Sequence, residues 1–288
     1  MVIPRDFRAL SAKLGSDPLQ IQGPGGNTSF KRDGTMWIKA SGTELAEAET
    51  RDIFVAVDVN RARAEIDGAG DGTCRAALLD ASGLRPSIET TFHALMDAPF
   101  VFHTHSVATL VHVTSEAGER AALEKLADLA PVLVPYAKPG LPLTRAIAER
   151  IAPDTRVILL ANHGLIVCGE SVSEVGDTIA KVEERLATEP GTPSAERARG
   201  GSYYPDHVVF LGPTLPSERV EGRPAWWDDE PRLAPDATPV QRTMLDCLAN
   251  VLARVPAEWT MRPIGEAAER DLMNWDAETY RQKLSGAA

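Results

Sequence analysis

The chain has 288 residues, of which 43% are hydrophobic and 25% are charged, a length and composition typical of a globular protein with a full core. Its net charge of −11 argues against a nucleic-acid-binding protein, because no basic excess can neutralise phosphates, although a few local groups can still hold one anion. The sequence has no N-terminal signal core and no apolar run of about 18 residues, so we expect a cytoplasmic protein without a membrane partner. Three widely spaced cysteines agree with a reducing compartment.

Residues 4–187 are predicted to alternate between helices and strands. The spacing of Phe7, Leu10 and Leu14 indicates a first helix, and Ser87 is a candidate N-cap for a later one. In chain order we predict a helix over 4–15, a glycine-rich loop over 23–30, strands over 35–39 and 54–57, a polar surface excursion over 60–75, a helix over 87–97, a strand over 100–102, helices over 107–115 and 118–129, a strand over 132–134, a helix over 142–151, strands over 156–160 and 165–167, and a helix over 173–187. Without a regular βαβ period, this order predicts an α/β sandwich rather than a doubly wound sheet.

The remaining third of the chain differs in composition. Residues 188–202 are rich in Pro, Gly, Ala and Glu and indicate a linker or an exposed loop. A short strand over 207–211, a Pro-rich stretch around Trp226 and helices over 239–253 and 265–284 are predicted to follow. We therefore divide the chain into a catalytic domain, residues 1–200, and a mainly helical C-terminal extension, residues 201–288, to which we assign no chemistry.

The chain carries a histidine pattern that suits a metal ion. His103 and His105 lie at the end of an apolar strand, where residues i and i+2 point to the same face. His163 ends a second apolar strand. Three imidazoles leave a tetrahedral zinc ion one open position, which is the catalytic arrangement. Histidines at strand ends often only complete hydrogen bonds, so the spacing by itself leaves that alternative open.

The other histidines and Glu89 are interpreted by position. His93 and His112 fit helices and are expected to be structural. His207 is also expected to be structural, although it could support the site or contact a substrate. Glu89 lies in the first turn of a predicted helix, where the helix dipole stabilises a carboxylate, and it gains a functional meaning only if that helix points at the metal.

Two small-residue turns and one helix start can bind an anion. Gly26 and Asn27 belong to the first turn, Ser41 and Gly42 to the second, and Ser87 to the helix start. Such turns present backbone N–H groups that can hold a phosphate or a carboxylate. Neither turn has the pattern of a nucleotide-binding loop, and each alone is more often a plain turn.

Taken together, these motifs resemble one family. They are, in order, Gly26-Asn27-Thr28-Ser29, Ser41-Gly42-Thr43, Pro86-Ser87-Ile88-Glu89, His103-Thr104-His105 and Asn162-His163-Gly164. The set resembles the class II aldolase/adducin head family, which includes fuculose-1-phosphate and rhamnulose-1-phosphate aldolases and ribulose-phosphate 4-epimerase. The resemblance covers residues 5 to 190, and its wording is closest to the aldolase part of the bifunctional rhamnulose-phosphate aldolase/dehydrogenase proteins.

The resemblance implies a fold and a site. It implies a three-layer α/β/α sandwich with a central, mainly antiparallel sheet, and a homotetramer with active sites near subunit boundaries. It assigns the three histidines to Zn²⁺ or another divalent metal ion. Glu89 would be a fourth ligand in the empty site and the acid/base during turnover. The two turns and Ser87 would hold the phosphate of a small anionic substrate.

The implied activity is that of a zinc-dependent lyase, which cleaves a small sugar phosphate or related hydroxy-keto compound through a metal-stabilised enediolate. Sugar-phosphate aldolases of the family typically carry a second serine where Ile88 stands, and no tyrosine occurs in 116–130 to protonate the leaving aldehyde. An epimerase, a dehydratase or a decarboxylase on the same metal site is therefore the alternative, and a non-catalytic adducin-like module is the third possibility.

Overall fold

A seven-stranded sheet forms the centre of the molecule, in a computed structural model that describes residues 3–68, 72–80 and 82–286. Its strand order is β3-β2-β1-β4-β7-β6-β5. The strands are β1 (Asn27–Arg32), β2 (Thr35–Lys39), β3 (Phe54–Asp58), β4 (Phe100–Thr104), β5 (Val132–Val134), β6 (Val157–Leu160) and β7 (Gly164–Gly169). All neighbours are antiparallel except β5 and β6, which are parallel. The predicted, mainly antiparallel sheet is therefore confirmed.

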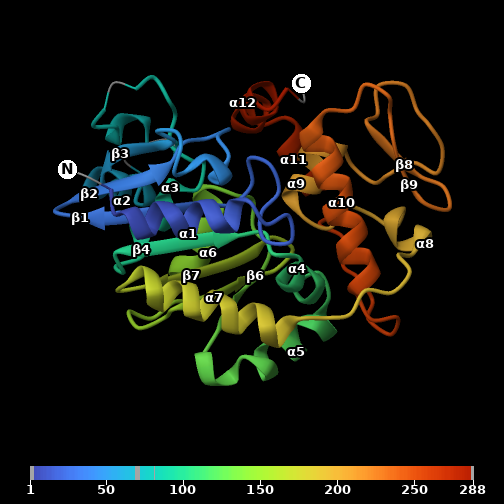
Figure 1. Cartoon of the computed structure of the whole chain (residues 1–288), viewed down its shortest axis with the longest axis horizontal. Helices are drawn as coiled ribbons and strands as arrows, with labels where there is room; N and C mark the ends of the chain where they lie inside the picture. The colour runs from blue at the N-terminus through green and yellow to red at the C-terminus, as the bar shows by residue number, and fades with distance from the viewer. Residues whose placement is uncertain (1–2, 69–71, 81, 287–288) are drawn as a thin grey trace.

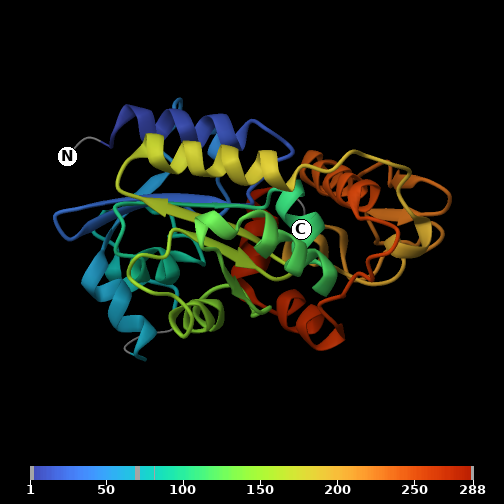
Figure 2. The ribbon, with the colours of Figure 1, turned by 90° about the horizontal axis from the view of Figure 1, so that it is seen from below.

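Helices cover both faces of this sheet. On one face, α1 (Arg5–Gly15) and α7 (Val172–Leu186) lie side by side, as the blue and yellow helices of Figure 2 show. On the other face lie α2 (Val59–Ile66), α3 (Thr90–Leu95) and α6 (Leu141–Ala148). The three-layer α/β/α sandwich is therefore confirmed.

The alternation of side chains along the central strands builds a core on each face. In β4, Phe102 packs into the cluster beneath α1 and α7, whereas Val101 packs into the cluster beneath α3 and α6. Residues of β7 alternate in the same way, with Val167 on the first face and Ile166 on the second. This period of two also decides which way the residues at the strand ends point.

The C-terminal extension is largely helical and packs beside one end of the sheet (Figure 1). Its elements are α9 (Pro205–Leu211), β8 (Ala225–Trp227), β9 (Pro231–Leu233), α10 (Pro239–Arg254), α11 (Glu266–Met273) and α12 (Asp276–Leu284). Three further helices precede it in the chain: α4 (Val107–Val113) and α5 (Glu116–Lys125), between β4 and β5, and α8 (Ala195–Ala198), after α7. Helix α10 packs against α4 and α9. Its buried Leu248 belongs to the same hydrophobic cluster as Phe7 and Phe102, so the two parts of the chain share one core.

Two segments differ from the sequence-based prediction in the type of structure. Residues 207–211, predicted as a strand, belong to helix α9, which begins at Pro205. A short apolar run does not distinguish a buried helix from a buried strand. Pro205, at the first helical position, is the local feature that indicates a helix here. Within the predicted surface excursion, residues 59–66 form α2, where the Asp58 carboxylate accepts a hydrogen bond from the Arg61 backbone N–H and caps the helix.

Three other segments differ in extent. The predicted loop over 23–30 contains the start of β1, which pairs with both β2 and β4. Helix α3 begins at Thr90 rather than at Ser87, with Glu89 as its N-cap residue. The helix predicted over 265–284 is broken between Met273 and Asp276 into α11 and α12. Among the described residues, no helix has the length and apolar character to cross a membrane.

The shared core yields a stability prediction. Leu248→Ala removes a fully buried side chain at the junction between α10 and the sheet domain, and we expect the free energy of unfolding to fall by about 2–5 kcal/mol. The matched control is Leu79→Ala, because the Leu79 side chain is 51% exposed and should change the value little. Urea unfolding followed by circular dichroism measures both variants. Equal stability of the two would contradict a core that extends into α10.

Candidate metal centre

Three histidines converge because their strands are neighbours in the sheet. His103 is paired with Ile166 in the β4–β7 register, and His105 follows directly after β4. His163 lies in the tight connection between β6 and β7. One ring nitrogen from each histidine lies within 4.8 Å of those of the other two, and all three side chains are buried. In the described part of the chain, this is the one group of three or more histidine, cysteine, aspartate or glutamate side chains that could hold a metal ion.

The backbone around His163 is built for this approach. Asn162 adopts a left-handed conformation with φ of 54°, and its side-chain amide donates hydrogen bonds to the carbonyl oxygens of Tyr203 and Arg262. Asparagine tolerates this conformation better than most residues. A Cβ atom at Gly164 would lie 2.3 Å from the Thr104 carbonyl oxygen, so only glycine allows β7 to come this close to the end of β4.

The hydrogen bonds of two histidines leave their ring lone pairs facing each other. His103 Nδ1 donates to the Leu165 carbonyl oxygen at 2.9 Å, and His105 Nδ1 donates to Asp206 Oδ2 at 2.8 Å. In these tautomers each Nε2 carries a lone pair, and the two Nε2 atoms are 3.0 Å apart. Two ligand nitrogens on a tetrahedral zinc ion are separated by about 3.3 Å, so this spacing fits a cation between them.

Glu89 faces the same point from the start of α3. Its Oε2 lies 3.4 Å from His103 Nε2, and its Oε1 lies 3.5 Å from His163 Nε2. Burial alone would raise the pKa of Glu89, but the two histidines and a hydrogen bond from Asn27 lower it below its usual value. Glu89 Oε1 and His163 Nδ1 are both buried without a hydrogen-bond partner among the described residues. An anionic carboxylate beside three imidazoles is a donor set that suits a divalent metal.

Burial keeps two of the imidazoles, those of His103 and His163, uncharged. It lowers the pKa of His103 to about 4 and that of His163 to about 3. Neutral imidazole is the form that binds metal ions, so the two rings are ready to act as ligands near neutral pH.

A second hydrogen-bonded layer holds Glu89 in place. Asn27 Nδ2 donates to Glu89 Oε2 at 2.8 Å, while Asn27 Oδ1 accepts from His93 Nε2 at 2.5 Å. His93 Nδ1 in turn lies 2.8 Å from the hydroxyl oxygen of Ser29. Burial lowers the pKa of His93 well below its usual value, so the ring is neutral and can donate and accept at once. His93, expected to be structural, orients Asn27 and through it Glu89.

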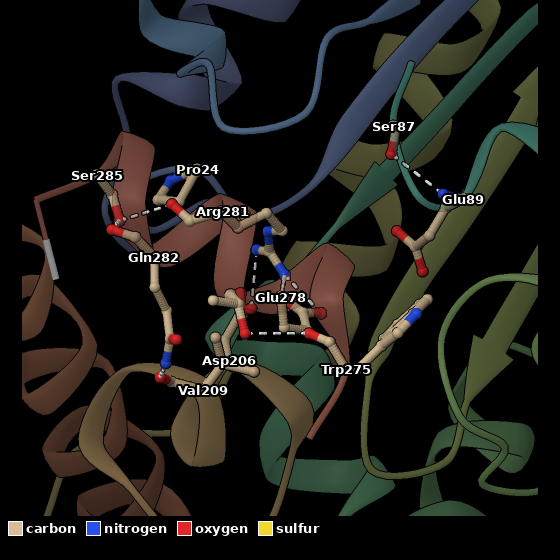
Figure 3. A network of polar contacts seen from close by, with 12 residues as sticks. Pro24, Ser87, Glu89, Asp206, Val209, Trp275, Glu278, Arg281, Gln282 and Ser285 are labelled. Carbon is tan, nitrogen blue, oxygen red and sulfur yellow. Dashed lines mark hydrogen bonds and ion pairs between the residues drawn. The ribbon is translucent and has the colours of Figure 1, made fainter. Parts of the chain in front are cut away.

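The C-terminal extension supplies a layer that the sequence analysis missed. Asp206, in the first turn of α9, accepts the hydrogen bond from His105 and also one from Arg281 Nη2 at 3.0 Å. Arg281, on α12, contacts both carboxylate oxygens of Glu278 through Nη1, as Figure 3 shows. Although burial would raise it, the pKa of Asp206 is held far below its usual value by Arg281 and His105. Asp206 therefore remains a carboxylate that orients the His105 ring.

The five residues predicted to bind an anion line one pocket together with Glu89, His105 and His163. They are Gly26, Asn27, Ser41, Gly42 and Ser87. The Lys39 ammonium group joins the two turns, because it donates to the carbonyl oxygens of Pro24 at 2.7 Å and Thr43 at 2.8 Å. Arg281 also lines the pocket. The buried ring of His207 does not line it; its Nδ1 accepts a hydrogen bond from the Tyr203 backbone N–H at 3.4 Å.

Comparison with known proteins identifies the family. Residues 9–189 match the family model of the class II aldolase and adducin N-terminal domain, which covers more than half of the chain. This chain belongs to that family. The resemblance seen in the sequence motifs is therefore confirmed, whereas a special closeness to the rhamnulose-phosphate proteins stays a prediction.

Individual relatives agree with this membership. The chain is 32% identical over 174 residues, 55% of its length, to a Bacillus subtilis (strain 168) protein named uncharacterized oxidoreductase YuxG, and covers 25% of that protein. It is 42% identical over 52 residues, 18% of its length, to the 3-oxo-tetronate 4-phosphate decarboxylase of Escherichia coli K12, and covers 24% of it. The N-terminal class II aldolase domain of a conserved Thermoplasma acidophilum protein superposes with a TM-score of 0.55 at 25% identity, over 63% of this chain and 90% of that one.

These matches cover only part of each curated relative, so the relatives' activities cannot be assigned to this chain from the matches alone. The chain spans about a quarter of the length of the curated relatives that it matches. The family match also ends before Asp206 and Arg281, so this layer of the candidate metal centre is supplied by residues outside the matched domain.

The contact between Asp206 and His105 yields a prediction for metal affinity. Asp206→Asn removes the charge that orients the His105 ring, and we expect the metal dissociation constant to rise by about 10- to 100-fold. Competition with a chromophoric chelator measures it. Asp128→Asn is the matched control, because Asp128 forms an exposed ion pair with Arg185 on another part of the molecule. An unchanged dissociation constant in Asp206→Asn would show that Asp206 does not support metal binding.

Proposed function

We propose that this class II aldolase-family chain is a metal-dependent carbon–carbon lyase that acts on a small, anionic sugar phosphate or a related hydroxy-keto compound. The observation that carries this proposal is the cluster of three buried imidazoles beside the Glu89 carboxylate, which lies 3.4 Å from His103 Nε2 and 3.5 Å from His163 Nε2. We further propose that the metal ion is zinc, and that the protein acts as a homotetramer in the cytoplasm.

In this proposal His103, His105 and His163 hold the ion. A bound divalent ion supplies Lewis-acid chemistry, which polarises a carbonyl oxygen and stabilises the negative charge that develops next to it. The protein contributes fixed ring orientations. The Leu165 carbonyl and the Asp206 carboxylate each accept a hydrogen bond from one ring, so the Nε2 atoms of His103 and His105 face each other without reorganisation.

Glu89 is proposed as the acid/base. Glu89 lines the pocket, and its Oε1 is buried without a hydrogen-bond partner among the described residues, so it can take a proton from a substrate hydroxyl or return it to a carbon atom. The Asn27 amide binds the other carboxylate oxygen and fixes the direction of Oε1. The lowered pKa of Glu89 keeps it ionised, and therefore able to accept a proton, at neutral pH.

The residues that bind the substrate are proposed from the lining of the pocket. We propose that Gly26, Asn27, Ser41, Gly42 and Ser87 bind the substrate. We also propose that residues 1–200 carry the catalytic groups and that residues 201–288 complete their outer layer through Asp206 and Arg281.

A decarboxylase acting at the same metal site is the second candidate. Its support is the 42% identity over 52 residues to the E. coli 3-oxo-tetronate 4-phosphate decarboxylase. Glu89 would then relay a proton from solvent to the carbon atom from which carbon dioxide departs.

One experiment separates the two candidates. The zinc-loaded protein is incubated with a panel of ketose phosphates and phosphorylated 3-oxo acids, and the products are identified by mass spectrometry and a coupled assay for dihydroxyacetone phosphate. Retro-aldol release of dihydroxyacetone phosphate is the expected result. Release of carbon dioxide alone selects the decarboxylase, and no product across the panel contradicts both.

The role of Glu89 is tested by Glu89→Gln. The amide keeps the shape of the side chain but cannot accept a proton, so we expect the metal to stay largely bound while turnover falls by about 100-fold or more. Glu124→Gln, an exposed side chain on α5, is the matched control and should keep full turnover. Metal content is measured by plasma mass spectrometry alongside the rate. Normal turnover in Glu89→Gln would exclude Glu89 as the acid/base.

A further inference from the structure

A second, larger cavity adjoins the histidine pocket. The pocket at the histidines, here called the inner pocket, leaves about 20 Å³ free, which is close to the space that one water molecule requires. The neighbouring cavity, here called the outer pocket, offers about 280 Å³, and its lining shares Ser41, Ile88 and Pro139 with the inner pocket. In this arrangement, a substrate that reaches the histidines has most of its volume in the outer pocket.

The outer pocket is positively charged. Arg75, Arg85 and Lys138 line it, and its lining contains no aspartate or glutamate among the described residues. None of these three cations forms an ion pair with a carboxylate in the described ranges of the chain. In the inner pocket, by contrast, Arg281 is already neutralised by two carboxylates.

Two aromatic rings of the C-terminal extension hold two of these cations in place. The guanidinium carbon of Arg85 lies 3.8 Å from the centroid of the Tyr280 ring, and the Lys138 ammonium lies 4.7 Å from that of Trp275. A cation–π contact fixes a side chain without neutralising its charge. Both cations are therefore positioned against the wall formed by α12 and remain available to an anion.

An unsatisfied hydroxyl marks the boundary between the two pockets. The Ser41 side chain is buried, and its Oγ has no hydrogen-bond partner among the residues that the structure describes. A buried hydroxyl without a partner is costly, so it indicates a position where a ligand or a water molecule completes the bonding. Because Ser41 lines both pockets, a ligand bound to its hydroxyl can extend from one pocket into the other.

We propose that the outer pocket binds a phosphoryl group at the far end of the substrate, with Arg75, Arg85 and Lys138 as its contacts. Three cations suit a dianion better than a single carboxylate, because each phosphate oxygen can accept a charge-assisted hydrogen bond. This assignment differs from the one that the family resemblance implies, in which the two turns and Ser87 hold the phosphate, because the inner pocket leaves only about 20 Å³ free and a Cβ atom at Gly42 would lie 2.4 Å from Leu284 of α12. The assignment of the substrate's other end to the histidines rests on the proposed function.

Calorimetric titration of the purified protein with inorganic phosphate tests this site. We expect Arg75→Gln and Arg85→Gln each to raise the dissociation constant by about tenfold, because each removes one charge-assisted hydrogen bond. The Arg75 side chain is exposed, so its replacement should leave the fold intact. Arg120→Gln, an exposed arginine on α5, is the matched control and should leave phosphate binding unchanged.

Several results would overturn the assignment. They are no phosphate binding at millimolar concentration, an unchanged dissociation constant in both Arg75→Gln and Arg85→Gln, or acetate binding as tightly as phosphate. Because the titration requires no turnover, these results are independent of the reaction assay. If the protein cleaves its substrate but binds phosphate equally well without Arg75 and Arg85, the proposed function stands and the outer pocket is excluded as the phosphate site.

Discussion

The fold brings together ring nitrogens whose lone pairs face one another in a buried space, and the rest of the site depends on this arrangement. His103 and His105 each use Nδ1 as a donor, which leaves two Nε2 atoms 3.0 Å apart with Glu89 beside them. Without a cation, such a cluster is electrostatically unfavourable. A divalent ion bound there would convert the same convergence into ligand bonds, and this would account for the polar groups that the sheet, α3 and the β6–β7 connection direct to one point.

The C-terminal extension is part of this arrangement rather than an independent appendage. Asp206 orients a metal-facing histidine, and Arg281 neutralises Asp206 from α12. The same helix and the residue before it form the wall that positions Arg85 and Lys138. Helix α12 therefore links the reacting end of the site to the cavity proposed for the substrate's phosphoryl group, and a change in its position would alter both.

The sequence analysis predicted those site residues that belong to short patterns along the chain. His103 and His105 share a strand face, and Glu89 begins a helix, so short patterns identified them. Asp206 lies 101 residues from His105 along the chain, and no pattern near it predicted the contact. The strand start in β1 was missed because Thr28 and Ser29 look like loop residues, although pairing with β2 and β4 buries them. Tertiary packing decided both cases.

Anomalous X-ray diffraction from crystals of the purified protein, measured above and below the absorption edge of zinc, tests the metal centre most directly. We expect one strong peak bounded by His103, His105 and His163, at about 2.0–2.1 Å from a ring nitrogen of each. A peak of another divalent metal at this point would change the identity of the ion but keep the site. A well-ordered site without any anomalous peak after zinc addition, or an ion bound elsewhere, would contradict a metal centre at these histidines.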